Sequence, residues 1–413
     1  MAQMTETLMY AALFVALFFQ VFLLLTYLGR DARERRLKAS AASDFPHIAV
    51  VVPCFNEECT IGATTQSLLA LDYPAELLEI LLVNDGSTDG TARVMNTFAH
   101  DPRITVIHKE NGGKHSGINL GLLRTKAEFV GCLDADSFVH PGALKEIIPH
   151  FENPRVAAVT ASMSVHNPQN PLERMQYAEY MIGIALRHIL SAVNGLHVTP
   201  GPFSFYRKSI LQEIGGFRRA HQTEDMEMAL RIQKNGYLIE NAPRAQVFTK
   251  APRTVWGLLK QRTRWTSGFM RNVYDYRSLI GNPRYGVLGM LTLPLGILSI
   301  LTGISLFVLT VVEATRDVVQ AISTQGDVPL AFALSALPHF DWFYVPVTGL
   351  LLLGVVAIGI IATTMVIAKR ISGVPGSIGL DVLWYVALYS IIAPLWLMRS
   401  ARDVAFSINR AWR

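Results

Sequence analysis

Four long apolar runs constrain the fold of this 413-residue chain more than any other feature of its sequence. They cover residues 8–28, 286–312, 343–368 and 380–398, the last of which is short and contains Pro394. A helix rises about 1.5 Å per residue, so about 20 residues can cross the roughly 30 Å hydrocarbon core of a bilayer. We therefore expect one transmembrane helix near the N-terminus and three near the C-terminus, with a water-soluble region between them.

The charges beside these runs predict an orientation. No small-residue cleavage site follows the first run, so we expect a retained anchor rather than a signal peptide. The basic stretch Arg30–Lys38 then places the soluble region in the cytoplasm of an integral, multi-pass inner-membrane protein. Three C-terminal crossings would leave the C-terminus outside, yet Arg399 and Arg402 favour the inside, as do the later Arg410 and Arg413. A basic tail at the outer interface, or a last segment that does not cross fully, would each resolve this conflict.

Composition excludes several classes of protein. Charged residues make up 17% of the chain, below the roughly 25% of soluble domains, and mean hydropathy is +0.30. Three cysteines without a CxxC pair favour a reduced, cytosolic domain over a disulfide scaffold. The net charge of +5 would suit a nucleic-acid binder. The basic residues lie beside apolar runs, however, so we expect a lipid bilayer as partner and no nucleic acid.

The soluble region, about residues 44–280, alternates between two patterns. Short β-branched runs predict strands at residues 47–53, 78–84, 103–109, 128–134 and 155–161. Helical stretches lie between several of them, for example at residues 60–71 and 115–123. This alternation predicts an α/β fold with a mostly parallel sheet covered by helices. Ligands of such sheets bind beyond the carboxyl ends of the strands, so polar residues there are candidate site residues.

Two acidic turns follow predicted strands. Asp85 lies in the glycine-rich turn Val83–Thr91, which offers a carboxylate and backbone donors, although an ordinary Asx turn with a helix cap is the alternative. Asp134 and Asp136 come directly after the fourth strand. Two carboxylates at this spacing can face one Mg²⁺ or Mn²⁺ ion, which takes further oxygen ligands from substrate phosphates.

Two further motifs stand at predicted helix starts. Lys114 follows two glycines and offers a cation for a phosphate or nucleotide, although the spacing is not that of a P-loop and a plain helix-entry loop is the alternative. Thr223, Glu224 and Asp225 read as a helix N-cap followed by first-turn acids. The functional interpretation, compatible with that one, adds a general base that accepts a proton from an acceptor hydroxyl.

An amphipathic helix is predicted over residues 256–272. Gln261 shares one face of it with Arg264 and Trp265, at spacings of three and four residues. An amide, a planar cation and an indole on one stripe can bind a sugar and its leaving diphosphate. The alternative is a basic helix on the membrane surface, anchored by Trp256 and Trp265.

Together and in this order, the motifs resemble those of the processive family-2 glycosyltransferases of membranes, which include cellulose, hyaluronan, chitin-type and poly-N-acetylglucosamine synthases. The resemblance covers about residues 47–280. Its motifs are Val52–Glu58, the Asp85 turn, Gly-Gly-Lys114, Asp134-x-Asp136, Thr223-Glu224-Asp225 and Gln261-Arg262-x-Arg264-Trp265. The most specific signal is the combination of the Thr-Glu-Asp motif with the Gln-Arg-x-Arg-Trp motif that follows it in the chain.

The resemblance implies a GT-A type domain that transfers a hexose from a UDP-sugar to the end of a growing glycan with inversion, using Mg²⁺ or Mn²⁺. It implies nucleotide binding by Pro53, Asn56, Glu57, Asp85, Lys114 and Asp134. It implies that Asp136 binds the metal and that Asp225, next to Glu224, is the catalytic base. It implies that the diphosphate and the acceptor are bound by Gln261, Arg262, Arg264 and Trp265.

We expect four parts: a transmembrane helix at 1–29, the GT-A domain at 30–253, interface helices at 254–283 and a transmembrane region at 284–413. Four helices form only a narrow path for a glycan, so a second copy of the chain or an accessory membrane subunit is left open as a partner.

Departures from the family's patterns bear on the polymer. Residues 197–204 lack the cysteine of the cellulose synthase acceptor motif. The Thr-Glu-Asp form occurs in cellulose and poly-N-acetylglucosamine synthases, so an N-acetylglucosamine polymer is favoured. Two other interpretations are weighed against it: a transferase that loads one sugar onto a lipid carrier, and an inactive subunit that binds nucleotide-sugar. A product ladder separates the first from a polymerase, and absence of UDP release would indicate the second.

Overall fold

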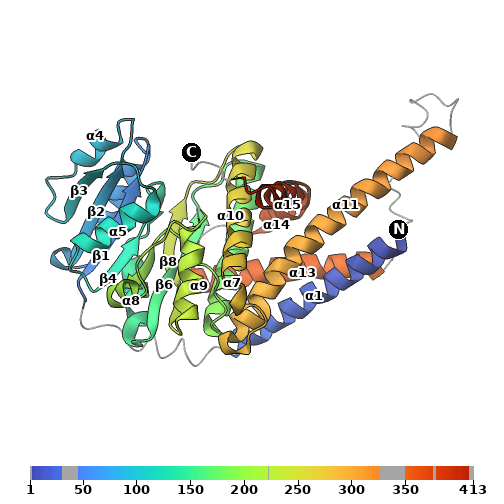
Figure 1. Ribbon diagram of the computed structural model, residues 1–413, viewed down its shortest axis with the longest axis horizontal. Coiled ribbons are helices and arrows are strands. Elements are labelled where there is room, and N and C mark those ends of the chain that lie inside the picture. The colour runs from blue at the N-terminus through green and yellow to red at the C-terminus, as the bar shows by residue number, and fades with distance from the viewer. Residues whose placement is uncertain (1, 30–44, 222, 325–348, 375–377, 409–413) are drawn as a thin grey trace.

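The computed structural model describes residues 2–29, 45–221, 223–324, 349–374 and 378–408. The basic stretch Arg30–Lys38, the start of the run 343–368, and Arg410 and Arg413 lie outside the described residues. Figure 1 shows an α/β domain from one side of which long helices project.

Within the described residues, eight strands form one sheet in the order β3-β2-β1-β4-β7-β6-β8-β5. They are β1 (Ile48–Cys54), β2 (Leu78–Asp85), β3 (Ile104–Lys109), β4 (Phe129–Cys132), β5 (Ser137–Val139), β6 (Val156–Val165), β7 (Ser204–Arg207) and β8 (Leu238–Thr249). The pairs β2–β3, β1–β2, β1–β4 and β6–β8 are parallel, whereas β7 runs antiparallel to both neighbours and β5 antiparallel to β8. The predicted mostly parallel sheet and its five predicted strands are confirmed.

Short helices cover both faces of this sheet. They are α3 (Ile61–Leu69), α4 (Thr91–Asn96), α5 (Lys114–Arg124), α6 (Ala143–Ile147), α8 (Lys208–Glu213) and α9 (Glu224–Lys234), with single turns η1 (Ala75–Leu77) and η2 (Ile148–Glu152). Val50 and Val52 of β1 pack against α3, whereas Ala49 and Val51 pack against α5 on the other face. Burial on both faces explains why the sequence of β1 is continuously apolar rather than alternating.

Two longer helices, α7 (Pro171–Ala192) and α10 (Val255–Asp275), stand between the sheet and the membrane helices. A capping box starts α7: the Asn170 side chain accepts a hydrogen bond from Glu173 N, and Glu173 returns one to the backbone of Asn170. The Thr254 hydroxyl caps α10 by accepting from Gly257 N. The capping side chains of Asn170 and Thr254 therefore define where the two helices begin.

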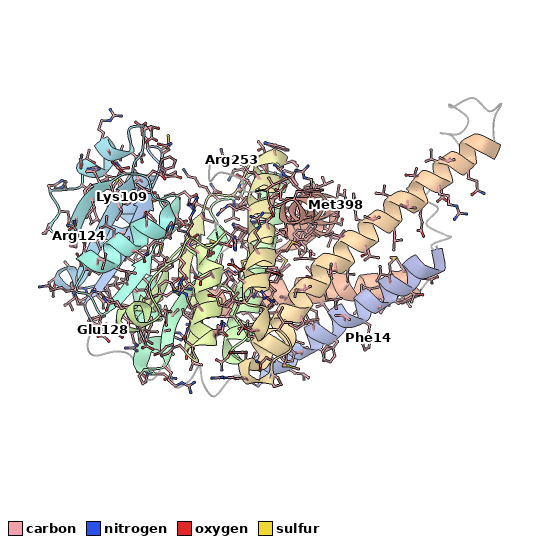
Figure 2. All side chains as sticks on the ribbon, in the orientation of Figure 1. Phe14, Lys109, Arg124, Glu128, Arg253 and Met398 are labelled. Atoms are coloured by element: carbon pink, nitrogen blue, oxygen red, sulfur yellow. The ribbon has the colours of Figure 1, made fainter. Side chains whose placement is uncertain are left out.

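In the part of the chain that the structure describes, four helices are long and apolar enough to cross a membrane, over Glu6–Leu28, Leu288–Gln320, Leu351–Ser372 and Gly379–Ala405. The elements involved are α1 (Ala2–Leu28), the π-turn η5 (Leu288–Thr292) with α11 (Leu293–Thr324), α13 (Gly349–Ser372), and α14 (Gly379–Trp384), η7 (Tyr385–Tyr389) and α15 (Ser390–Ala405). The turns η3 (Arg277–Leu279) and η4 (Pro283–Tyr285) join α10 to η5. In Figure 2 the helix α1, on which Phe14 is labelled, projects away from the α/β domain. The predicted division into one N-terminal and three C-terminal apolar helices is confirmed, and these helices mark a membrane protein.

Candidate active site

A cavity of about 420 Å³ opens at the carboxyl edge of the sheet. Strands β1, β2 and β4 are parallel, so the segments that follow them meet at this edge. The predicted residues that line the cavity are Pro53, Glu57, Asp85, Lys114, Asp134, Asp136, Glu224, Asp225, Gln261, Arg264 and Trp265. Asn56 and Arg262 do not line it. The volume is that of an ordinary small-molecule site.

Asp85, at the end of β2, holds the glycine loop that leads into α5. Its carboxylate accepts hydrogen bonds from Gly112 N at 3.0 Å and Gly113 N at 2.8 Å, and Lys109 Nζ lies 2.5 Å away. Gly113 has φ of +86°, a backbone conformation that glycine adopts without strain. Asp85 thus fixes the position of the loop as well as facing the cavity.

Asn56 supports a different segment, the turn that follows Asp85. Its backbone is left-handed, with φ of +56°, and its side-chain oxygen accepts a hydrogen bond from Thr88 N at 2.9 Å. Its own N–H donates to Ser87 Oγ at 3.1 Å. Asn56, for which the resemblance implied nucleotide binding, therefore holds the turn after Asp85 and does not line the cavity.

Lys114 begins α5 and joins two carboxylates across the cavity. Its Nζ lies 2.6 Å from Asp134 Oδ1 and 3.1 Å from Glu224 Oε1. Burial works against the charge of the ammonium, but these carboxylates outweigh it and hold the pKa of Lys114 well above its ordinary value. Burial by itself would raise the pKa of Glu224, but the Lys114 ammonium outweighs this effect and lowers that pKa.

Asp134 and Asp136 follow β4 in a tight turn, closed by a hydrogen bond from Ser137 N to Asp134 O at 3.0 Å. Both line the cavity and offer hard oxygen donors. No group of three or more histidine, cysteine or acidic side chains forms a metal cage within the described residues. A pair of carboxylates nevertheless fits Mg²⁺ or Mn²⁺, because these ions complete their coordination with substrate phosphates and water.

Glu224 and Asp225 open α9 at the centre of the site. Burial, and then the neighbouring Glu224, raise the pKa of Asp225 to about 6. The loop before β7 is fixed to this point, because Thr199 donates from its hydroxyl to Asp225 O at 2.8 Å. A carboxylate whose pKa lies near neutral is suited to accept and release a proton at physiological pH.

Thr223 corrects one local prediction. It occupies the N-cap position of α9, but its hydroxyl makes no capping hydrogen bond. Instead it accepts a hydrogen bond from Asn272 Nδ2 of α10 at 2.8 Å. Gly268 permits this close approach, since a Cβ there would lie 2.3 Å from Thr223 Oγ1. The Thr223 hydroxyl thus joins α9 to α10 and does not cap the N-terminus of α9.

The helix α10 presents Gln261, Arg264 and Trp265 to the cavity, as its periodicity predicted. Arg262 points elsewhere: it is buried, its Nη2 lies 2.6 Å from Glu179 Oε2, and its Cζ stands 4.2 Å from the Trp265 ring centroid. The expected binding role of Arg262 does not fit this placement. Its contacts suit a support for Trp265 from behind.

Several cavity residues were not found from the sequence. They include Tyr180 and Arg187 of α7. The loop residues His197, Pro200 and Gly201 also line the cavity, and the sequence had singled out residues 197–204 only for comparison with an acceptor motif. Two nitrogens of Arg187, Nε and Nη2, are buried without a hydrogen-bond partner in the described part of the chain. Burial lowers the pKa of Arg187 to about 10, so it stays charged at neutral pH. The Pro-Gly-Pro sequence at residues 200–202 is typical of a turn, and it was the sequence feature that could have indicated this side of the cavity.

Residues 46–268 match the model of a family described as Glycosyltransferase like family 2. The chain belongs to this family. Among curated proteins, it is 33% identical over 225 residues to a poly-β-1,6-N-acetyl-D-glucosamine synthase of Staphylococcus epidermidis, covering 54% of each chain. It is 30% identical over 272 residues to the synthase of that name from Staphylococcus aureus, covering 64% of this chain and 65% of the relative. This glycosyltransferase thus spans between half and two thirds of the length of the relatives it matches.

A solved mannosyltransferase from Pyrobaculum calidifontis, in complex with GDP-Man and Mn²⁺, is similar in fold. Its TM-score is 0.61 at 19% identity, covering 98% of this glycosyltransferase and 99% of that chain. The likeness confirms the GT-A-like fold. With the family match, it establishes a GT-A-like domain that carries the cavity described above.

Proposed function

We propose that this glycosyltransferase moves N-acetylglucosamine from UDP-N-acetylglucosamine to the end of a growing β-linked polysaccharide, with inversion at the sugar carbon. The observation that carries the proposal is the meeting of three groups in one cavity: Asp225, the pair Lys114–Asp134, and the stripe of α10 at Gln261 to Trp265. The two staphylococcal relatives, both named as synthases of this polymer, support the choice of sugar.

The donor end of the cavity would lie between β1, β2 and α5. There Pro53 and Glu57 offer a wall, Asp85 a carboxylate and Lys114 a cation for the nucleotide. Asp134 and Asp136 would hold a divalent metal, which supplies positive charge to the leaving diphosphate when bound. Arg264 adds a second cation from α10, next to the acidic pair of α9.

The chemistry then needs one proton transfer and one displacement. Asp225 takes the proton of the acceptor hydroxyl, and the resulting oxygen forms a bond to the anomeric carbon of the donor sugar. The bond from that carbon to the diphosphate breaks at the same time, and UDP leaves with the electron pair. Lys114 and Arg264, which both line the cavity, would stabilise this negative charge. Glu224, paired with Lys114, keeps the ammonium in position.

The acceptor end would be formed by α10 and α7. Trp265 offers an indole face for a sugar ring, with Gln261 and Arg264 beside it for hydroxyl groups. Arg187 lines the same cavity, and a buried guanidinium with unpaired nitrogens is costly until oxygen atoms reach it. A glycan hydroxyl or ring oxygen would satisfy it. On this proposal residues 30–253 form the donor domain and residues 254–283 the acceptor side.

A donor screen tests the function. The full chain in proteoliposomes is given UDP-N-acetylglucosamine, UDP-glucose or UDP-glucuronate with Mg²⁺ or Mn²⁺, and UDP release and product masses are recorded. We expect UDP release with UDP-N-acetylglucosamine and a ladder of products spaced by one N-acetylhexosamine. A product limited to one sugar on a lipid would overturn the polymerase assignment. Absence of UDP release with every donor would overturn the assignment as an active transferase.

A further inference from the structure

The cavity has a polar end at which the reaction proposed above places no catalytic group. It is formed by Arg187 on α7 and His197 on the loop that follows α7, and both side chains line the cavity. This loop packs against the start of a membrane helix, because a Cβ at Gly195 would lie 3.0 Å from Val287 and 3.1 Å from Thr292, just before α11. The polar end is therefore on the side of the cavity towards α11.

Arg187 presents an open edge of its guanidinium. Its Nε and Nη2 are buried and have no hydrogen-bond partner in the part of the chain that the structure describes. These two nitrogens share one edge of the planar group and their N–H bonds run parallel, so they suit a ligand with two neighbouring oxygen atoms. The third nitrogen lies against α7 itself, since a Cβ at Gly183 would be 3.1 Å from Arg187 Nη1. Gly183, one turn earlier, thus gives the guanidinium room on this face of the helix.

His197 adds a neutral partner beside this edge. Burial, and then the charge of Arg187, lower the pKa of His197 to about 4, so its imidazole is uncharged at neutral pH. Its Nδ1 is buried without a partner among the described residues. The ring stands edge-on to Phe269 of α10, with 5.9 Å between the two centroids. A sugar hydroxyl both donates and accepts a hydrogen bond, so it matches Nδ1 in either tautomer.

The helices α7 and α10 run side by side in the same direction. Met175 of α7 and Leu258 of α10 share one apolar cluster, and four residues later on each helix Glu179 pairs with Arg262 at 2.6 Å. Arg262 also stands with its Cζ 5.7 Å from the ring centroid of Tyr180. Positions along the two helices can therefore be compared directly.

Arg187 and His197 lie further along these helices than the acceptor residue Trp265. His197 contacts Phe269, which is one turn beyond Trp265, and a turn advances about 5.4 Å along a helix. Arg187 is two turns beyond Tyr180 on the same face of α7. One helical turn is comparable with the length of one sugar unit. A glycan whose last sugar lies on Trp265 would therefore bring its second sugar to this end of the cavity.

The surroundings favour a neutral ligand over a second anion. Burial lowers the pKa of Arg187 only to about 10, so the guanidinium stays charged and donates charge-assisted hydrogen bonds to neutral oxygen atoms. Acidic side chains outnumber basic ones around the cavity, and the donor diphosphate, once bound, adds to this excess. The acids are Glu57, Asp85, Asp134, Asp136, Glu224 and Asp225, against Lys114, Arg187, Lys250 and Arg264.

We propose that Arg187 and His197 form a second acceptor subsite, which binds two neighbouring oxygen atoms of the sugar next to the chain end. This proposal rests on the transfer reaction proposed above. A single sugar on Trp265 does not reach the subsite, so the enzyme favours extension of a chain over its initiation. Gly183 and Phe269 position the two groups, and neither lines the cavity.

Acceptor length tests the subsite in the full chain. Proteoliposomes receive UDP-N-acetylglucosamine with Mg²⁺ or Mn²⁺ and either N-acetylglucosamine or its β-linked dimer, and kcat/KM for each acceptor is measured from UDP release and product masses. We expect the wild-type protein to prefer the dimer by about tenfold or more, as charge-assisted hydrogen bonds predict. In Arg187→Lys this preference should fall by about tenfold, because lysine keeps the charge but lacks the two parallel donors. Arg174→Lys is the matched control on α7, since Arg174 pairs with Asp381 and does not line the cavity.

Gly183→Ala is a second variant that retains both polar side chains. The added methyl group displaces the guanidinium only slightly, so the preference for the dimer should fall by a smaller factor than in Arg187→Lys. Melting curves exclude unfolding in each variant. An Arg187→Lys protein that loses activity equally with both acceptors, or a wild-type protein without preference for the dimer, would overturn the subsite.

Reactions started with donor alone give a measurement that needs no added acceptor. Arg187→Lys should form a ladder of shorter chains than Arg174→Lys does, because every addition after the first uses the subsite. Ladders of equal length would overturn the subsite and leave the proposed function intact. A wild-type protein that adds only one sugar, or releases no UDP, would overturn the proposed function itself.

Discussion

The Lys114 ammonium lies 2.6 Å from a carboxylate oxygen of Asp134, so the glycine loop and the acidic turn after β4 form one ion-paired unit. Gly201 leaves room for this pair, because a Cβ at that position would lie 2.4 Å from Lys114 Nζ and 3.1 Å from Asp134 Oδ1. A donor phosphate entering the cavity would meet a cation that is already fixed in place.

Gly201→Ala should weaken donor binding without unfolding the domain. The atom in the way is the end of a flexible side chain, so the ammonium would be displaced rather than the backbone. Charge-assisted hydrogen bonds contribute about 1.5–3 kcal/mol, which predicts a loss of UDP affinity of about tenfold or more. Calorimetric titration with UDP checks this. Gly142→Ala is the control, since its Cβ would meet nothing closer than 3.6 Å, and equal UDP affinity in the two variants would contradict the prediction.

Asp225→Asn should reduce turnover by about 10² or more and leave donor affinity nearly intact, because an amide cannot take the proton of the acceptor hydroxyl.

The same variant should also change stability. The folded chain binds the Asp225 proton more tightly than the unfolded chain does. The stability gained from that proton is present below the ordinary pKa of 3.8 and is lost as pH rises through about 6. At neutral pH the variant should therefore melt at an equal or higher temperature. Collapse of UDP binding in a folded variant would show instead that Asp225 holds the donor.

The pH dependence of turnover should show an acid limb near pH 6. Burial and Glu224 raise the pKa of Asp225 to about 6, and the base acts only when deprotonated. Below this value kcat/KM should fall by about tenfold per pH unit. Initial rates from about pH 5 to about pH 8 measure this, with melting curves at each pH to exclude unfolding. A rate that stays constant down to about pH 5 would remove Asp225 from the role of base.

Asp136→Asn should abolish turnover and weaken metal-dependent UDP binding, because a neutral amide is a poor ligand for a hard cation. Chelation of the wild-type protein should have the same effect, reversed by added Mg²⁺ or Mn²⁺. Asp72→Asn is the matched control, because the Asp72 side chain is 63% exposed, pairs with Lys145 and does not line the cavity. Full activity of wild-type protein in excess chelator would rule out a metal-dependent reaction.

Trp265→Ala should give shorter chains or none while donor hydrolysis continues, since ring contacts contribute about 0.5–1.5 kcal/mol beyond burial.

Arg262→Lys should produce a milder form of the Trp265→Ala defect. It should raise the acceptor KM more than it lowers kcat, because a lysine retains the charge beside Glu179 but loses the planar stack on the indole. Arg277→Lys is the control, with a similar stack on Tyr274 outside the cavity. Product lengths by mass spectrometry and separate donor and acceptor kinetics check both variants. Unchanged chain length in Trp265→Ala would return α10 to the role of a membrane-surface helix.

Local patterns were sufficient for much of the fold and the donor side of the site. The strands around Val51 and Leu82 are buried on both faces, so continuous apolar runs identify them. Asp85, Asp134 and Asp136 follow such strands, and the rule that parallel strands end at one edge brings them together without knowledge of the loops.

Nonlocal pairing decided the parts that sequence reasoning missed. The strand β7 has only four residues and is held by pairing with β4 and β6, so its own sequence carries little signal. The loop before it reaches the cavity because Thr199 bonds to the carbonyl of Asp225, which lies 26 residues away. Arg187 lines the cavity from α7, the helix that precedes that loop in the chain.

The sequence by itself determined the family, the mostly parallel sheet and the row of acidic and basic residues at its edge, because each depends on local periodicity and on residue types at strand ends. Only the tertiary structure decided which face of α10 meets the cavity, so that Arg264 lines it while Arg262 pairs with Glu179. It also decided that Asp381 and Asp403, at opposite ends of one apolar segment, are bonded to Arg174 of α7 and Arg271 of α10. Hydropathy sums the apolar surface of a helix but does not contain the partners of its few polar groups, and those partners come from distant parts of the chain.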